Sequence, residues 1–344
     1  MNIKFLSLAT IALFAITSIS CSKSDPDTTT AAKPNPNVII SSGGLVVNTG
    51  DLKIIVIDTA KINTVTMTGS SETTIVNRNL TRSSSIGDFS ISDDGTKFVY
   101  IDVQYSTNNI RTSTIRVANI NGTNDAIIYT APANTATNTV QLKYVKFGAS
   151  KIFFASDMQT IPYTTTVTKI SSVNFDGTGL MSDMAPSGGN DISYDGKYIA
   201  TLAQIAGTSD QNIIIVDRAG NSGAGTLYHA VAIPSTISFY ASKPVFSFDG
   251  KFVYYSYIES QNLKVNITDI AAKTSQIKTI ATGIPFIQFG LNISVASDNN
   301  RGIVTVKNFN SSSFPTKSYV FDLANSTSTS FSNSDAFIFD IHTF

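Results

Sequence analysis

The feature that most limits the fold of this 344-residue chain is a hairpin that it repeats. The stretches FSISDDGTKFVYID (89–102), DISYDGKYIATL (191–202) and FSFDGKFVYYSY (246–257) each read as a strand, a tight Asp-Gly turn and a second strand. Weaker copies complete a series whose turn glycines follow one another at intervals of 48 to 54 residues: Gly44, Gly95, Gly148, Gly196, Gly250 and Gly302. A fixed period of this length is the signature of a repeat architecture.

A second mark recurs in each period, where an apolar strand ends in Asp or Asn and a turn follows. The marks are Asp58, Asn119, Asn174, Asp217, Asp269 and Asp322. Asp and Asn suit this place because their side chains bond the backbone two residues on and tolerate turn geometry. We therefore interpret them as structural residues, in preference to metal ligands or catalytic groups.

Each period contains four short strands: one into the Asp-Gly turn, one out of it, a third that ends at the Asp or Asn, and a fourth. Glutamate occurs only at Glu72 and Glu259, while Ser, Thr and Asn are abundant, so the composition disfavours helices. The sequence predicts an all-β fold over residues 38–344, a β-propeller of six four-stranded blades. The strand AFIFDIHTF (336–344) is left over at the end, and we expect it to pair into the first blade and close the ring. Seven blades are the alternative.

The hairpins FSFDGKFVYYS, ISYDGKYIATL and FSISDDGTKFVY resemble the Ser-Pro-Asp-Gly-Lys hairpin of TolB-like, WD-type propeller repeats. The resemblance covers roughly residues 38–344 and is clear in three repeats. The chain departs from the pattern in lacking the usual proline before Asp, where it has Asp93, Tyr194 and Phe248. It also leaves no room for the amino-terminal α/β domain of TolB, so the resemblance implies the fold and no Tol-Pal role.

The first twenty residues, MNIKFLSLATIALFAITSIS, place Lys4 before an apolar run and end in small residues. This pattern is typical of a secretory signal peptide. The alternative is a membrane-spanning helix, but a span needs about 20 apolar residues and the run from Phe5 to Ile16 is shorter.

Cys21 is the only cysteine of the chain, and TSISC resembles a bacterial lipobox with Ser18 where Leu is more usual. The resemblance implies acylation of Cys21; the alternative is ordinary cleavage that leaves a free thiol. Residues 22–37 are polar and Pro-rich, which predicts a flexible tether. Their Lys-Ser-Asp-Pro-Asp resembles the surface-export signals of some Gram-negative lipoproteins. We therefore expect an exported protein, lipid-anchored in the cell envelope at the outer membrane, on its periplasmic or cell-surface side.

Charge excludes one class of partner. Lys plus Arg and Asp plus Glu number 24 each, so no global field attracts nucleic acid.

Propeller connections alternate between two faces, so the Asp-Gly turns and the Asp or Asn turns are expected on one face and the long, irregular connections on the other. Variable loops on a rigid scaffold are typical of a binding face. On it we predict a ligand- or partner-binding set: Tyr105, Arg111, Tyr163, Tyr240, Tyr257 and Phe314. At the channel mouth, where the inner strands begin, we place Asp88, Asp191, Lys243 and Gln288. The alternative is that the loop aromatics pack on neighbouring loops.

Enzymatic motifs are few. The only histidines are His229 and His342, too few for a histidine-based metal cluster, and His342 falls in the closing strand, where a structural role is expected. No Gly-x-Ser-x-Gly elbow, phosphate loop or paired-Cys zinc motif occurs. SDDGTKF resembles the sialidase aspartate box, but the required spacing does not recur between repeats. A channel lined by Asp and Asn could hold Ca²⁺, as in six-bladed lactonases, although no complete ligand set is evident.

Two functions follow. The first is a membrane-anchored binding or scaffold propeller for a glycan, peptide or protein partner. The alternative is a metal-assisted hydrolase or lyase with its site in the central channel.

Overall fold

The computed structural model describes residues 38–39, 52–58, 61–66, 72–77, 84–105, 111–119, 121–160, 165–184, 189–204, 211–219, 225–233, 241–284, 289–296, 298–308, 317–324, 326–332 and 337–343. All of them belong to one compact unit, Asn35–Phe344. The predicted signal peptide, Cys21 and the tether lie outside the described residues. Within the described ranges, no helix is long and apolar enough to cross a membrane.

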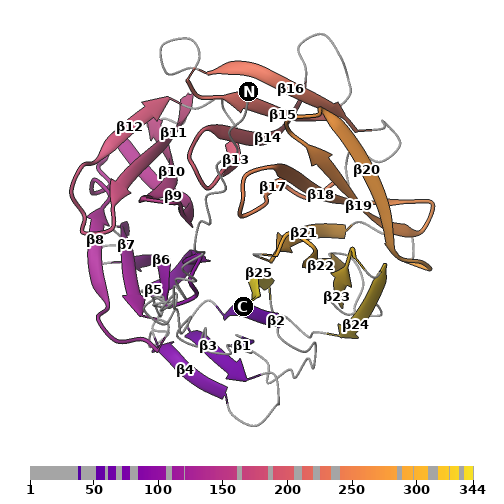
Figure 1. Ribbon diagram of the computed structural model, residues 1–344. Coiled ribbons are helices and arrows are strands. Elements are labelled where there is room, and N and C mark those ends of the chain that lie inside the picture. The colour runs from indigo at the N-terminus through magenta and orange to yellow at the C-terminus, as the bar shows by residue number, and fades with distance from the viewer. Residues whose placement is uncertain are drawn as a thin grey trace, which may run out of the picture. The chain divides into compact units, whose positions relative to one another are not determined.

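Five four-stranded antiparallel blades are arranged around a common axis (Figure 1). In each blade the strands follow one another in sequence order, the first innermost. The blades are β5 (Ser84–Ile91), β6 (Lys97–Tyr105), β7 (Arg111–Asn119) and β8 (Ala126–Thr130); β9 (Asn138–Phe147), β10 (Lys151–Thr160), β11 (Thr165–Asn174) and β12 (Met181–Met184); β13 (Gly189–Ile192), β14 (Tyr198–Gln204), β15 (Gln211–Asp217) and β16 (Thr226–Ala232); β17 (Val245–Phe246), β18 (Phe252–Glu259), β19 (Asn262–Asp269) and β20 (Thr274–Ala281); β21 (Phe289–Val295), β22 (Arg301–Asn308), β23 (Lys317–Asp322) and β24 (Thr327–Ser332).

The repeated Asp-Gly stretches form the tight turns between the first and second strands. In the turn from Ser193, the Gly196 amide donates to the Ser193 carbonyl at 2.8 Å. The Asp195 carboxylate accepts the Ser193 hydroxyl at 2.6 Å and the Lys197 amide at 2.9 Å. Gly196 has a φ of +73°, which explains the glycine. The same bonds recur in 92–97 and 247–252, so the sequence repeat is a repeat of turn chemistry.

The Asp and Asn marks end the third strands of all five blades, as the sequence predicts. The Asp217 carboxylate accepts the Ala219 amide and the Asp322 carboxylate accepts the Ala324 amide, each at 2.9 Å. Asn119 donates from its side chain to Thr123 Oγ1 at 2.9 Å. These bonds stabilise the following turn, which confirms the structural interpretation.

The remaining sheet has five strands in the order β25-β2-β1-β3-β4. They are β1 (Val38–Ile39), β2 (Leu52–Asp58), β3 (Lys61–Thr66), β4 (Glu72–Asn77) and β25 (Phe337–Thr343). The C-terminal strand β25 pairs antiparallel with β2, and β1 lies between β2 and β3. β25 also contacts β5 on one side and β21 and β22 on the other, which confirms that the C-terminal strand pairs into the first sheet.

The structure therefore has five four-stranded blades, and the prediction of six such blades, or alternatively seven, is wrong. The error lies in the first repeat. The hairpin expected around Gly44 lies outside the described residues, and the strand that precedes β2 in the sheet order is β25. If the strands of this sheet are counted from β25, β2 is the second, so Asp58 ends a second strand where the sequence predicted the end of a third. The sheet then has an additional strand, β4, before β5 begins. A pairing between the two ends of a chain leaves no local sequence signal.

The core lies between adjacent blades. Because each blade is covered on two sides, its middle strands are buried almost throughout: Phe98 to Val103 in β6 and Val253 to Ile258 in β18 are all buried. Four apolar clusters join neighbours, for example Val99 and Ile115 of one blade with Phe154 of the next. Full burial of one such side chain stabilises the fold by roughly 1.5–3 kcal/mol.

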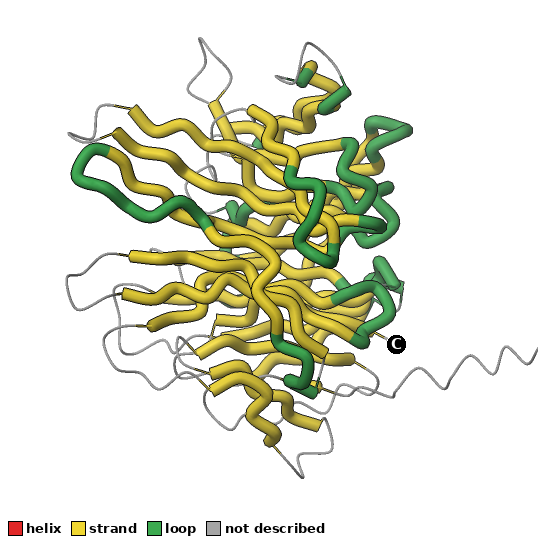
Figure 2. Tube along the Cα trace, turned by 90° about the vertical axis from the view of Figure 1, so that its left-hand side faces the viewer, coloured by secondary structure: helices red, strands yellow, loops and turns green. Residues whose placement is uncertain are grey.

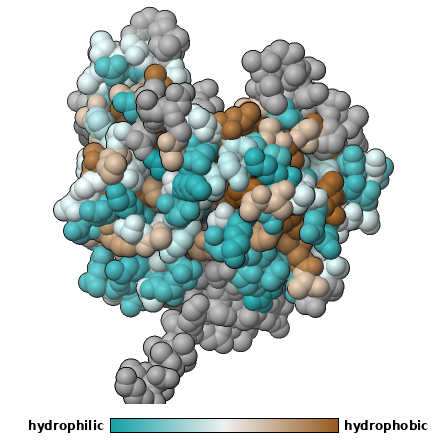
Figure 3. Space-filling model, turned by 45° about the horizontal axis from the view of Figure 1, so that its top comes forward, coloured by the Kyte–Doolittle hydropathy of each residue, from teal (hydrophilic) through white to brown (hydrophobic). Residues whose placement is uncertain are grey.

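The strands run between two faces, and most described turns lie at one end of them (right in Figure 2). The exposed apolar residues of the outer strands, such as Ile127, Leu227 and Ile277, are isolated. In the view of Figure 3, apolar residues form small areas among hydrophilic ones. Scattered apolar side chains of this kind are normal on a protein surface.

Candidate binding channel

The inner strands of the five blades enclose a cavity of about 590 Å³. Its wall is formed by residues of β5, β9, β10, β11, β13, β17 and β21, and of the segments just before and after β17. The volume lies within the range of about 300–1,000 Å³ that small-molecule sites occupy. This channel is therefore a concave site of the size that small molecules occupy.

At the inner edges of the β9–β12 and β17–β20 blades, side chains of the preceding blade accept backbone amides. Asp88 Oδ2 accepts the Val145 amide at 2.8 Å, and Ser90 Oγ accepts the Phe147 amide at 3.2 Å. An unpaired buried amide is costly, so these bonds both protect the edge and fix the inner strands to one another. The channel wall is therefore rigid where these residues lie.

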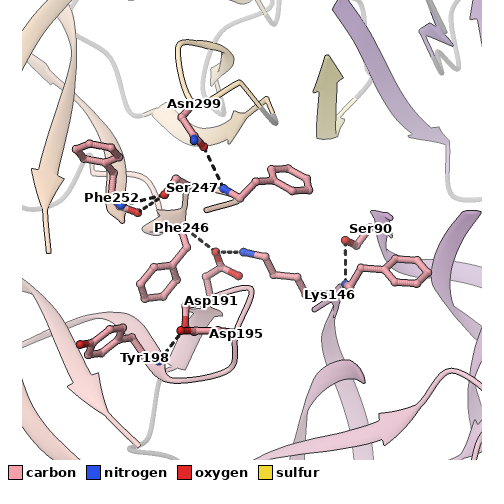
Figure 4. Close-up of polar contacts among 12 residues, drawn as sticks. Ser90, Lys146, Asp191, Asp195, Tyr198, Phe246, Ser247, Phe252 and Asn299 are labelled. Atoms are coloured by element: carbon pink, nitrogen blue, oxygen red, sulfur yellow. Dashed lines mark hydrogen bonds and ion pairs between the residues drawn. The ribbon is translucent and has the colours of Figure 1, made fainter. Parts of the chain in front are cut away.

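Asp191 links three blades at the centre of the channel (Figure 4). Its Oδ2 accepts the Lys146 ammonium at 2.7 Å and the Phe246 amide at 2.7 Å. Lys146 Nζ also lies 5.9 Å from the centre of the Phe246 ring, within cation–π range. The Asp191 side chain is 10% exposed and that of Lys146 18%, so water screens this pair little.

A second ion pair lines the same cavity. Lys143 Nζ lies 3.2 Å from Asp157 Oδ2, and the Thr168 hydroxyl donates to Asp157 Oδ1 at 2.8 Å. With Lys243 and Asp88, the cavity is lined by three lysines and three aspartates. The wall thus combines apolar surface with charged groups that carry no net formal charge.

Tyr144 is among the residues that line the cavity. Its hydroxyl is buried and has no hydrogen-bond partner among the described residues. Burial, and then the negative charges of Asp191 and Asp88, raise the pKa of Tyr144 above its usual value, so the phenol stays protonated.

Three of the four predicted channel residues line this cavity: Asp88, Asp191 and Lys243. Gln288 lies outside the described residues. One detail of the prediction is wrong, because Asp191 lies two residues before the turn that starts at Ser193, at the end of β13 and away from the strand's start. The local reason is that β13 begins only at Gly189.

Sequence reasoning missed Lys143, Tyr144, Lys146 and Asp157. A signal for Lys146 exists: it stands two residues before Gly148, where the turn of its blade begins, as Asp191 stands two residues before Ser193. Aligning the repeats on the turn would have placed Lys146 at the same level of the channel as Asp191.

Three of the six predicted binding-face residues lie among the described ones: Tyr105, Arg111 and Tyr257. Tyr105 and Arg111 lie opposite each other at the adjoining ends of β6 and β7, and Tyr105 is 38% exposed. Arg111 Nε is buried with no hydrogen-bond partner among the described residues. Tyr163, Tyr240 and Phe314 lie outside the described residues, so their role stays a prediction.

The prediction for Tyr257 is wrong. Its side chain is 2% exposed and stacks on Tyr255, with ring centres 5.8 Å apart, inside an inter-blade cluster. The reason is the connection that follows: Ser260 and Gln261 form a two-residue turn with φ of 50° and 65°, between Glu259 and Asn262. The strand therefore continues past Tyr257, where the sequence suggested a long loop.

The channel carboxylates do not form a calcium site by themselves. Among the described residues, no group of three His, Cys, Asp or Glu side chains is placed to hold a metal ion. Asp191 and Asp157 each face a lysine ammonium. A calcium site stays a prediction that needs residues beyond the described ones. Of the histidines, His229 lies half-buried in β16, and position 342 lies in β25 opposite Lys53.

Comparison with solved structures identifies the fold. The chain is similar to the crystal structure of TolB from Acinetobacter baumannii, with a TM-score of 0.55 and 13% identity over 85% of this chain and 65% of that chain. The match thus spans less than two thirds of the TolB chain. Lower-scoring similarities include an oligogalacturonate lyase from Vibrio parahaemolyticus (TM-score 0.46, 14% identity, 72% of this chain and 69% of that chain). Another is a chain of a nidogen/laminin complex (TM-score 0.49, 11% identity, 85% of this chain and 97% of that chain).

No family model matches the sequence, and no curated protein matches it. At this level of identity the similarity establishes a β-propeller and nothing about the ligand.

Proposed function

We propose that this chain is an exported, lipid-anchored binding protein whose propeller channel takes up a small polar ligand. The observation that carries the proposal is the cavity of about 590 Å³, with its three lysines and three aspartates. A few convergent polar groups in a cavity of this size are typical of a binding site.

The polar side chains of the channel wall are preorganised. Asp88, Ser90 and Asp191 are each held by an amide of the next blade, so their side chains need no reordering. A preorganised site binds more tightly because less side-chain entropy is lost on binding. This rigidity supports a binding role for the channel.

The finer description of the scaffold is part of the proposal. We infer that the five-stranded sheet closes a TolB-like ring, which the pairing of β25 with β2 supports. We also propose that Cys21 is acylated, which TSISC and the single cysteine support. Residues 22–37 would then tether the propeller to the outer membrane.

A thermal-shift screen of the purified mature chain tests the channel. The library contains sugars, amino acids, short peptides and organic acids. A ligand at 100 times its dissociation constant stabilises the protein by about 2.7 kcal/mol, which is readily detected. We expect at least one compound to raise the melting temperature of the wild type and of Tyr105→Ala, and not that of Lys146→Met. Failure of every compound, or an equal shift in Lys146→Met, would contradict the proposal.

A further inference from the structure

The tight turns carry an unexpected set of residues at their second position. In the three full-length Asp-Gly turns the fourth residue donates its amide to the carbonyl of the first, which is Ser92, Ser193 or Ser247. Proline is favoured at the second position of such a turn because it fixes φ near −65°. This chain instead has Asp93, Tyr194 and Phe248 there. Two of the three are aromatic, which turn formation does not require.

The two aromatic rings meet at the turn end of the channel. The ring centres of Tyr194 and Phe248 are 6.3 Å apart, with an angle of 41° between the ring planes. Phe248 lines the cavity, and both side chains are only half-buried. Aromatic surface thus lies beside the polar cavity, at the end opposite the predicted long-connection face.

Neighbouring blades hold this pair in place from two sides. The Tyr194 carbonyl accepts the Ala149 amide of the β9–β12 blade at 2.9 Å. The Phe248 amide donates to Asn299 Oδ1 of the β21–β24 blade at 3.1 Å (Figure 4 shows Asn299 above the channel residues). The backbone of each aromatic residue is therefore fixed by a blade other than its own.

A short turn beside Tyr194 brings a carboxylate towards it. In the β9–β12 blade the Gly148 amide bonds the Lys151 carbonyl, whereas in the next blade the Ser193 amide bonds the Tyr198 carbonyl, so the first turn is two residues shorter. Across this short turn, Asp93 and Asp94 of the β5–β8 blade lie near Tyr194. Burial, and then these two negative charges, raise the pKa of Tyr194. The turn end of the channel thus combines two rings with an exposed carboxylate, Asp93.

From this geometry we propose that ligands enter the channel at the tight-turn end and that the Tyr194–Phe248 pair is a platform for a sugar ring. The inference rests on the proposed function and names its ligand class. A sugar ring has an apolar face that an aromatic ring can cover, and its hydroxyls both donate and accept hydrogen bonds.

The cavity behind the platform matches a neutral, polyhydroxylated ligand. Lysine ammonium groups can only donate and carboxylates can only accept, and the wall has three of each. The Lys146–Asp191 pair offers both kinds of group within 2.7 Å of one another, so neighbouring hydroxyls can bond to both. An equal number of positive and negative groups favours a neutral sugar over an anionic or cationic ligand.

A glycan array probed with the purified mature chain tests the ligand class, and two variants test the platform. Tyr194→Pro removes one ring at a position where proline suits the turn, so its melting temperature should stay within about 2 °C of the wild type. Phe248→Leu keeps the amide that bonds Asn299 and removes the other ring. Leu227→Ala is the control, since Leu227 is 65% exposed on the outer strand β16 and does not line the cavity.

We expect the wild type to bind at least one oligosaccharide. Binding should weaken about tenfold or more in Tyr194→Pro and in Phe248→Leu, and less than about twofold in Leu227→Ala. Unchanged binding by both platform variants would overturn the placement of the sugar. If no glycan binds while the thermal-shift library yields another ligand class that depends on Lys146, the sugar inference fails and the channel function stands. If neither assay finds a ligand, both fail.

Discussion

Replacing Asp191 with alanine removes the one side chain that links three blades in the channel. The substitution deletes the acceptor of the Phe246 amide and the partner of the Lys146 ammonium, both at 2.7 Å. Loss of one partner of a buried ion pair costs about 3–5 kcal/mol, because the other charge stays buried. Since the pair borders a cavity that water can enter, we expect the lower limit, about 3 kcal/mol.

This loss predicts a measurable change in melting temperature. With an unfolding entropy of about 2.1 cal/mol/K per residue over roughly 300 residues, about 3 kcal/mol lowers the melting temperature by about 5 °C. Calorimetry of Asp191→Ala, Lys146→Met and the double variant should show that the two losses are not additive, because both remove the same interaction. Lys251→Met is the control: the Lys251 side chain is 73% exposed in its pair with Asp249, and its loss should shift the melting temperature by less than about 1 °C.

Two results would refute this reasoning. One is a melting temperature of Asp191→Ala within about 1 °C of the wild type. The other is a double variant whose loss equals the sum of the two single losses, which would mean that Asp191 and Lys146 do not interact in solution.

Three further predictions concern packing, pH and the anchor. Gly148→Ala should destabilise the protein by about 1–3 kcal/mol in urea unfolding, because the added Cβ would lie 2.3 Å from the Phe153 ring; an unchanged midpoint would contradict this contact. Burial, and then the Lys273 ammonium, lower the pKa of His229, so the unfolded chain binds this proton more tightly and stability falls as the pH drops below about 6.5. His229→Gln should flatten the pH dependence of the melting temperature between about pH 7.5 and 5.5, and an unchanged slope would count against this protonation effect. Cys21→Ala should move the protein from the membrane to the soluble fraction, and a wild-type N-terminal peptide without acyl mass would exclude the anchor.

The fold could be predicted from the sequence wherever the hairpin repeats carry their own turn chemistry. Ser193, Asp195 and Gly196 make hydrogen bonds within their own turn, so the same residues at the same spacing predict the same turn in three blades. The first sheet could not be predicted in this way. The leftover C-terminal strand predicts that it closes this sheet, but its register, in which Leu52 pairs with Thr343 almost 300 positions away, leaves no local pattern.

The channel could be predicted only in outline. Asp88, Asp191 and Lys243 were found because acidic and basic residues stand out in inner strands, while Lys146 was missed because its repeat is degenerate. Tyr257 shows a different error, because the sequence assigned it to the binding face and the structure buries it. Tyr257 packs between two blades because the turn after Glu259 has only two residues, so the strand continues past it. With a longer connection the same residue would lie in a loop.

The most direct test of the central claim is a crystal structure of the mature chain with the library compound that stabilises it most. We predict that the compound lies in the cavity between β5, β9, β13, β17 and β21, in contact with Lys146 or Asp191. A compound found elsewhere, for example beside Tyr105 and Arg111, with the cavity holding only water, would contradict the account.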